Sequence, residues 1–158
     1  MSLSVNDSVS ILPCANFHNT KNSYIEYRPG TLNVIVTVPH GGQLRPKSLP
    51  NRDFGSRVGD EIRYDHRYLK DAELPVKTKS DLRTIELAAA LERGLETETG
   101  RKPHVVVNHL HRVKLDCNCG VEEGTFGVGE AVAAWNAFHG SIETAISSLN
   151  GSSQLIYF

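Results

Sequence analysis

The stretch VIVTVPHGG, Val34 to Gly42, places a histidine and two glycines directly after a run of branched apolar residues. Branched residues favour strands, and an unbroken apolar run is typical of a strand that is buried on both faces, as in a parallel sheet. We therefore expect a buried strand over Leu32 to Val38. His40 then stands just beyond the carboxyl end of that strand.

Strand and helix patterns alternate along the rest of the chain. Apolar residues recur at spacings of three and four from Ile85 to Leu95, which is typical of an amphipathic helix. The elements expected are a helix from a cap at Ser80 or Asp81 to Gly100, a strand over His104 to Asn108, a helix over about Glu130 to Leu149 and a strand over Gln154 to Phe158. This order predicts an α/β fold, a mostly parallel sheet flanked by helices.

A further strand candidate lies upstream, at Tyr24 to Tyr27. The turn residues Arg28-Pro29-Gly30 follow it, so we expect it to form a hairpin with Leu32 to Val38. Residues 1–22 are polar and aperiodic, and we expect a flexible N-terminal arm there. Residues 23–158 are expected to form a single α/β hydrolase-like domain.

Composition excludes several classes of protein. The net charge is -1 and the basic residues are scattered, which argues against nucleic acid or a membrane surface as the partner and favours a small molecule. The sequence contains no run of about 18 apolar residues, so it predicts no transmembrane helix, and the N-terminus does not resemble a signal peptide. Three cysteines do not make a disulfide framework, so a cytoplasmic location is expected.

Polar residues follow the two central predicted strands, His40 after the first and Asn108, His109 and His111 after the second. In open α/β sheets, ligands bind in the crevice outside the carboxyl ends of the strands. Neutral imidazole is a common metal ligand, and the two glycines after His40 would let a metal or ligand approach closely. A structural or surface role is the alternative for a single histidine.

Three sequence blocks stand in a fixed order: VPHGG at 38–42, SDLRTIEL at 80–87 and NHLHRVKLDCN at 108–118. Together they resemble the N-formylglutamate amidohydrolase family, over a region from about Leu32 to the helix that holds Trp135 and His139. The resemblance implies a zinc-carboxypeptidase-like (phosphorylase/hydrolase-like) fold, related to that of aspartoacylase. It also implies zinc-dependent hydrolysis of N-formylglutamate or a related N-acyl amino acid, with release of the acyl group.

A catalytic zinc takes about three protein ligands and keeps a water whose pKa falls to about 7. His40 is the expected first ligand. The carboxypeptidase pattern has Glu three residues later, where this chain has Gln43, so Asp81 is the expected carboxylate ligand. The alternatives are that Asp81 is a plain helix N-cap and that Glu86 takes its place. The third ligand and the general base are left unassigned.

An acidic substrate requires cationic and donor groups, of which a planar guanidinium is the preferred clamp. Arg112 and Lys114 would lie on one face if the strand continued, with Asp116 as an orienting partner and Asn118 as a further donor. A solvated basic edge is the alternative. The family pattern ends this block with an arginine, whereas this chain has Cys119, so one substrate contact is expected to be missing.

Other residues of this region have competing interpretations. Cys117 and Cys119 could bind a soft metal, although the C-x-C spacing lacks a second cysteine pair. His109 and His111 could form a metal pair if the chain is extended, or simply flank Arg112. We expect His139 to pack in a helix interface.

The sequence printed ends in the apolar run Leu155 to Phe158, where the resemblance implies a further strand and an Asp-x-His motif with another zinc ligand. We therefore expect an incomplete, C-terminally truncated domain that binds zinc weakly and catalyses poorly, unless His109 or His111 substitutes. The alternatives to a zinc amidohydrolase are a catalytically inactive truncated paralogue and a binder of acidic small molecules.

Overall fold

The computed structural model describes residues 22–52, 56–58, 61–63, 77–149 and 154–157. Its main sheet has four strands in the order β1-β5-β2-β6, namely β1 (Ile25–Arg28), β5 (His104–Asn108), β2 (Val34–Val38) and β6 (Gln154–Tyr157). β2 is parallel to β5 and to β6, whereas β1 is antiparallel to β5. The sheet is therefore mixed.

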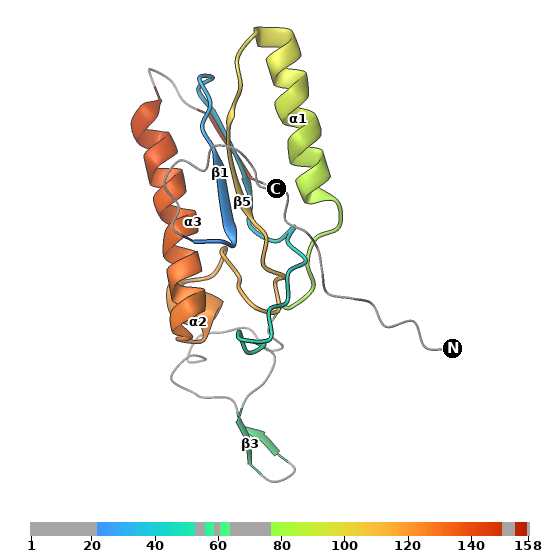
Figure 1. The fold of residues 1–158 in the computed structure, drawn as a ribbon, viewed down its shortest axis with the longest axis vertical. Helices are drawn as coiled ribbons and strands as arrows, with labels where there is room; N and C mark the ends of the chain where they lie inside the picture. The colour runs from blue at the N-terminus through green and yellow to red at the C-terminus, as the bar shows by residue number, and fades with distance from the viewer. Residues whose placement is uncertain (1–21, 53–55, 59–60, 64–76, 150–153, 158) are drawn as a thin grey trace, which may run out of the picture.

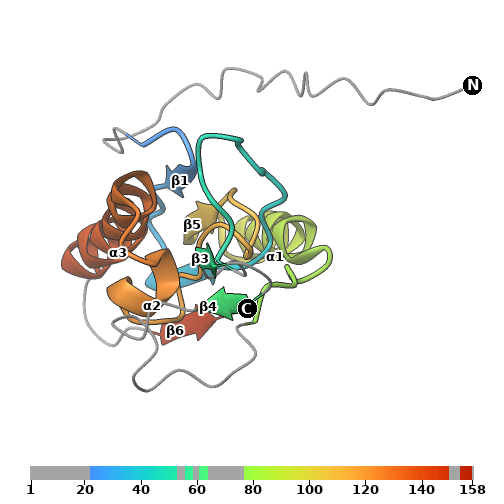
Figure 2. The same ribbon diagram turned by 90° about the horizontal axis from the view of Figure 1, so that it is seen from below.

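Helices cover both faces of this sheet. α1 (Thr84–Thr99) lies on one face, and α3 (Gly129–Ser148) with the short α2 (Val121–Thr125) lies on the other (Figures 1 and 2). All five residues of β5 are buried, because each face of the strand packs against a helix layer. One apolar core joins the sheet to α3 around Phe138, and a smaller core joins it to α1 around Ala88. The prediction of an α/β fold with flanking helices is confirmed in this general form.

The predicted hairpin between the first two strands is wrong. β5 lies between β1 and β2, and it pairs with both. The backbone N–H groups of Thr31 and Leu32 both donate to the carbonyl of Lys102 at 2.8 Å. A Cβ on Gly30 would lie 2.3 Å from the same carbonyl oxygen, so the turn passes directly over the chain that enters β5. This long-range contact, which turn residues alone do not encode, separates the two strands.

The predicted start of the first helix is also wrong. Neither Ser80 nor Asp81 caps it, because the N-cap is Arg83, which has left-handed backbone angles with φ 62°. The N–H of Asp81 instead donates to the carbonyl of His40 at 3.1 Å. The end of the helix is as predicted: Gly100 is the C-cap, with φ 67° and its N–H bonded to the carbonyl of Glu96.

The other predicted elements correspond to β5, β6 and α3, within one or two residues at their ends. Two elements were not predicted, α2 and the hairpin of β3 (Ser56–Val58) with β4 (Glu61–Arg63). The expected N-terminal arm, apart from Asn22, lies outside the described residues. None of the helices in the described ranges is long and apolar enough to cross a membrane.

Candidate functional site

Asn108 ties together the two loops that leave the carboxyl ends of β2 and β5. Its amide Nδ2 donates to the carbonyl of Pro39 at 2.8 Å, and its Oδ1 accepts from the N–H of Leu110 at 3.0 Å. The two loops then continue side by side, with a parallel bridge between Leu44 and Leu110. Asn108 is fully buried, so its role in this structure is to position the loop that carries His40.

The two glycines after His40 serve close packing within the protein. A Cβ on Gly42 would lie 2.2 Å from the carbonyl carbon of His109, and a Cβ on Gly41 would lie 2.4 Å from Oγ1 of Thr84. Gly42 thus lets two backbones meet, and Gly41 lets α1 approach the loop. The expectation that these glycines open space for a ligand is wrong, because protein atoms already fill that space.

His40 lies between two carboxylates. Its Nε2 is 2.7 Å from Oδ1 of Asp116, and its Nδ1 is 3.4 Å from Oδ2 of Asp81. The side chains of His40 and Asp116 are 5% and 1% exposed, whereas that of Asp81 is 46% exposed. The hydrogen bond from the backbone N–H of Asp81 to the carbonyl of His40 holds the two residues next to each other.

The two contacts of His40 differ chemically. An ionised carboxylate only accepts hydrogen bonds, so the short contact requires a proton on Nε2 of His40. In the neutral ring, Nδ1 is then a lone pair that faces the carboxylate of Asp81. Two acceptors at this distance need a positive centre between them, either a proton on Nδ1 or a metal ion.

The separation of Nδ1 and the Asp81 oxygen suits a metal ion. Tetrahedral zinc with ligands at 2.0–2.1 Å sets them about 3.3 Å apart, close to the 3.4 Å seen between these two atoms. Asp116 would then have the usual place of a carboxylate that fixes the ring of a ligating histidine. The described residues contain no group of three or more His, Cys, Asp or Glu suited to hold a metal, so His40 and Asp81 are a pair of candidate ligands without a third among these residues.

Asp116 is the hub of the site, since it links His40 to two arginines. Its Oδ1 accepts from His40 and from the backbone N–H of Asn118, and its Oδ2 lies 2.8 Å from Nε of Arg112 and 3.7 Å from a terminal nitrogen of Arg52. Burial raises the pKa of Asp116. The hydrogen bonds from His40 and Arg112, with the charges of His40 and Arg52, more than offset this and hold the pKa well below its ordinary value.

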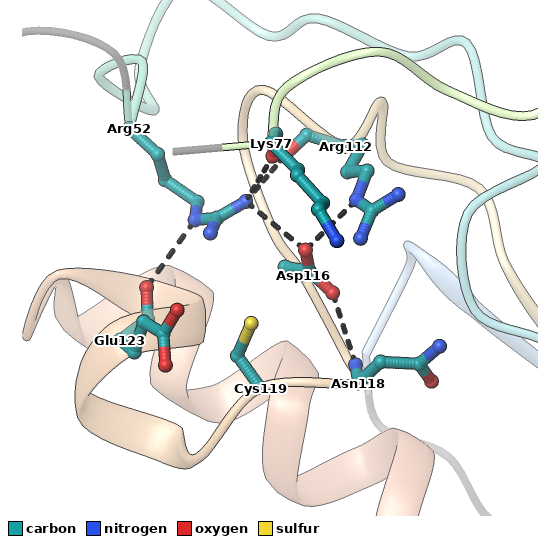
Figure 3. Close-up of a pocket in the computed structure, with 7 residues that line it drawn as sticks. All are labelled: Arg52, Lys77, Arg112, Asp116, Asn118, Cys119 and Glu123. Atoms are coloured by element: carbon teal, nitrogen blue, oxygen red, sulfur yellow. Dashed lines mark hydrogen bonds and ion pairs between the residues drawn. The ribbon is translucent and has the colours of Figure 1, made fainter. Parts of the chain in front are cut away.

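A pocket of about 420 Å³ opens beside Asp116 (Figure 3). The residues that line it are Arg52, Lys77, Arg112, Asp116, Asn118, Cys119 and Glu123. The set holds three cations against two carboxylates, and one of those carboxylates already pairs with the arginines. Arg112 pairs with Asp116 through Nε and lines the pocket, and among the described residues no hydrogen bond or ion pair involves its two terminal nitrogens. The pocket is suited to an anion.

Arg52 is a site residue that the sequence did not reveal. Its side chain is only 2% exposed, and its guanidinium donates to the carbonyls of Arg112, Glu123 and Lys77 at 2.8, 3.4 and 3.5 Å. It also stacks 5.7 Å from the ring centre of Phe126. Neither Arg52 nor Lys77 belongs to a periodic pattern or a motif of the sequence.

Arg112 and Lys114 do not share a face. β5 ends at Asn108, and these residues form a turn in which the N–H of Lys114 donates to the carbonyl of His111 at 2.7 Å. The ammonium of Lys114 is buried against the carbonyl of Leu49, and Lys114 is absent from the described lining of the pocket. The structure therefore brings together Arg112, Asp116 and Asn118 but not Lys114.

The histidine pair is separated in the same way. Nε2 of His109 bonds to Glu26 at 2.8 Å, whereas His111 faces Arg45, so the two rings do not converge on one metal. His139 packs against Trp135 within α3, with ring centres 3.8 Å apart, and its Nε2 bonds to the backbone carbonyl of Cys117 at 3.1 Å. The ring therefore contacts its own helix and the segment before α2. Glu86 is exposed in the first turn of α1.

Cys117 and Cys119, the cysteines within the described residues, are free thiols. Burial raises the pKa of Cys117 well above its ordinary value. Burial, together with the charges of Asp116 and Glu123, raises the pKa of Cys119 to about 12. Both thiols are therefore protonated at neutral pH, the state in which sulfur is a poor nucleophile and a poor metal ligand.

Comparison of the chain with protein-family models, with curated proteins and with solved structures finds no match. The functional argument consequently rests on the geometry of the site and on the sequence blocks that contribute to it.

Proposed function

We propose that this protein is a zinc-dependent amidohydrolase-like enzyme that acts on N-formylglutamate or a related N-acyl amino acid. The observation that carries the proposal is His40, whose Nδ1 faces Asp81 while its Nε2 is held by Asp116. The zinc-carboxypeptidase-like arrangement of the sheet is part of the same proposal, supported by a site at the carboxyl ends of two parallel strands.

His40 and Asp81 would hold the metal, with Asp116 as the residue that fixes the ring of His40. A zinc ion in such a site lowers the pKa of a bound water to about 7 and polarises the carbonyl of an amide. Asp116 keeps a proton on Nε2 of His40, which leaves the Nδ1 lone pair for the metal. The hydrogen bond from Arg112 and the buried charge of Arg52 help to keep Asp116 ionised in turn.

The carboxylate of the substrate would bind in the pocket next to this centre. Arg112 presents its terminal nitrogens, Lys77 adds a positive charge and Asn118 adds an amide. Arg52 and Lys77 can supply the charge that was expected to be missing because Cys119 replaces an arginine. A substrate with an acidic amino-acid part thus fits the charge of the pocket better than a neutral one.

The assay is hydrolysis of N-formylglutamate by the full chain, with and without added zinc, followed by release of the acyl group. We expect slow turnover, in keeping with a centre that has two candidate ligands, which a chelator abolishes and which His40→Ala removes. Because His40 is buried and its variant could misfold, Asp81→Asn is the second test at a half-exposed position. His109→Gln, another histidine of the same region, is the matched control and should keep its activity.

Absence of zinc-dependent turnover of any N-acyl amino acid tested would contradict catalysis. It would leave the second candidate function, a binder of acidic small molecules, which the excess of cations in the pocket favours. Calorimetry with glutamate distinguishes the two, because a binder needs no zinc. In either case Arg112→Lys should weaken binding about tenfold, since lysine keeps the charge but loses the bidentate geometry.

A cytoplasmic location completes the proposal. It is supported by the two free thiols in the described residues, since a reducing compartment keeps cysteines in this form.

A further inference from the structure

The described residues also line a second pocket, of about 560 Å³. Its lining residues are Gln43, Arg45, Asn51, Thr78, Lys79, Ser80, Leu82, His111 and Val113. Lys77 and Arg112 border the first pocket, whereas their neighbours Lys79 and His111 border the second. The two pockets thus share no described lining residue, although neighbouring residues of the same segments line both.

The second pocket has a positive lining without a counter-charge. Arg45 and Lys79 are cationic, and none of its described lining residues is acidic. Most of the other residues carry hydroxyl or amide groups. A wall of this composition is suited to a ligand that brings negative charge and accepts hydrogen bonds.

The contacts of the His111 ring show that this side of the pocket has more hydrogen-bond donors than acceptors. The backbone N–H of Val113 donates to Nδ1 of His111 at 3.1 Å, so Nδ1 is the lone pair in the tautomer that keeps this hydrogen bond. A neutral imidazole carries its proton on the other nitrogen, Nε2. That nitrogen lies 2.5 Å from a terminal nitrogen of Arg45, which is itself always a donor.

In this tautomer, Arg45 and the N–H of His111 are two donors that face each other at the edge of the pocket. In the other tautomer the N–H of Val113 loses its acceptor, so one donor lacks a partner in either case. Protonation of the ring would not remove this conflict, because Nδ1 would then become a donor against the N–H of Val113. Burial, with the charge of Arg45, lowers the pKa of His111 and keeps the ring neutral. His111 is only 7% exposed, so bulk water does not readily satisfy its N–H. An acceptor between Nε2 of His111 and Arg45 would satisfy both.

We propose that this pocket is an oxyanion-binding site, in which Arg45 and the Nε2–H of His111 converge on one phosphate or carboxylate group. Arg45 is exposed and can swing away from the ring to make room for the oxygen atoms. Lys79 adds charge from the opposite chain segment, and Ser80 is already committed to the carbonyl of Gly42. The proposal does not depend on the hydrolase activity of the first site.

Calorimetric titration of the full chain with inorganic phosphate and with glutarate tests this site, because the two ligands separate a phosphate source from a carboxylate source. We expect saturable binding of at least one of them. Arg45→Gln and His111→Gln should each weaken it about tenfold, since each removes a charged or buried donor. Arg93→Gln, which changes an exposed arginine of α1 outside the pocket, should bind like the wild type.

Binding must also survive in Arg112→Gln, which changes the first pocket and spares the second. Loss of binding in Arg112→Gln, with Arg45→Gln unaffected, would assign the anion to the first pocket and overturn the proposal. Absence of saturable binding of both anions up to about 10 mM would overturn it as well. Far-ultraviolet circular dichroism of each variant shows whether it is folded, and Arg45 is exposed enough that its variant should be.

Discussion

Replacement of Asp116 by asparagine should destabilise the protein strongly. Asp116 is 1% exposed, and its two oxygens accept hydrogen bonds from His40 on one side and from Arg112 on the other. Asparagine keeps the shape of the side chain but has only one acceptor oxygen, so its NH₂ group must face a donor. The variant also leaves Arg52, 2% exposed, without its buried counter-charge.

Removal of one partner from a buried ion pair costs about 3–5 kcal/mol. For a domain of this size, such a loss lowers the melting temperature by about 6–20 °C. Urea unfolding in the presence of a chelator measures the change without a contribution from bound metal. Glu98→Gln, at an exposed position of α1, is the control and should stay within about 0.5 kcal/mol of the wild type. A loss below about 1 kcal/mol in Asp116→Asn would refute the role of Asp116 as the electrostatic hub.

Two further predictions concern the frame of the site. The hydrogen bond from His109, opposed by burial and supported by Arg28, lowers the pKa of Glu26 to about 2. The ionised form of Glu26 therefore stabilises the fold fully above the ordinary pKa of 4.5, and this stabilisation is lost as the pH falls toward 2. Over this range the free energy of unfolding of the wild type should fall by up to about 3 kcal/mol more than that of Glu26→Gln. Parallel curves of stability against pH for the two proteins would contradict this. Gly42→Ala should destabilise by more than about 1 kcal/mol, because its Cβ would meet the rigid backbone of His109 at 2.2 Å. Thermal unfolding measures the effect. Gly94→Ala, on the open side of α1, is the control and should not lower the melting temperature. A melting temperature of Gly42→Ala equal to that of the wild type would show that the loop can shift to accept the Cβ.

The sequence predicted the elements of the fold better than their pairing. The apolar runs of β2 and β5 and the periodicity of α1 and α3 are local signals, and these elements occur where they were expected. The partner of β1 is decided by the contact of Thr31 and Leu32 with Lys102, some 70 residues along the chain, which no local pattern encodes. The start of α1 was misplaced because the backbone of Asp81 is held by His40.

The same division holds for the site. The rule that ligands bind at the carboxyl ends of parallel strands pointed to His40 and to the residues after Asn108, and the structure places His40, Asp116 and Arg112 in one network. Lys114 was misjudged, since the alternation of a strand was extended into a turn. Arg52 was missed because a buried arginine in an irregular segment leaves no periodic signal in the sequence.

Zinc binding by the full chain is the most direct test of the account, because the central claim is that His40 and Asp81 face a metal ion and do not merely share a proton. Elemental analysis after equilibrium dialysis against zinc, which also detects weakly bound metal, should find one zinc per chain in the wild type. Asp81→Asn should reduce this content, and Glu86→Gln, a carboxylate five residues further along at an exposed position of α1, should keep it. Wild-type protein that retains no zinc, or an Asp81→Asn variant that retains as much as the wild type, would contradict the claim.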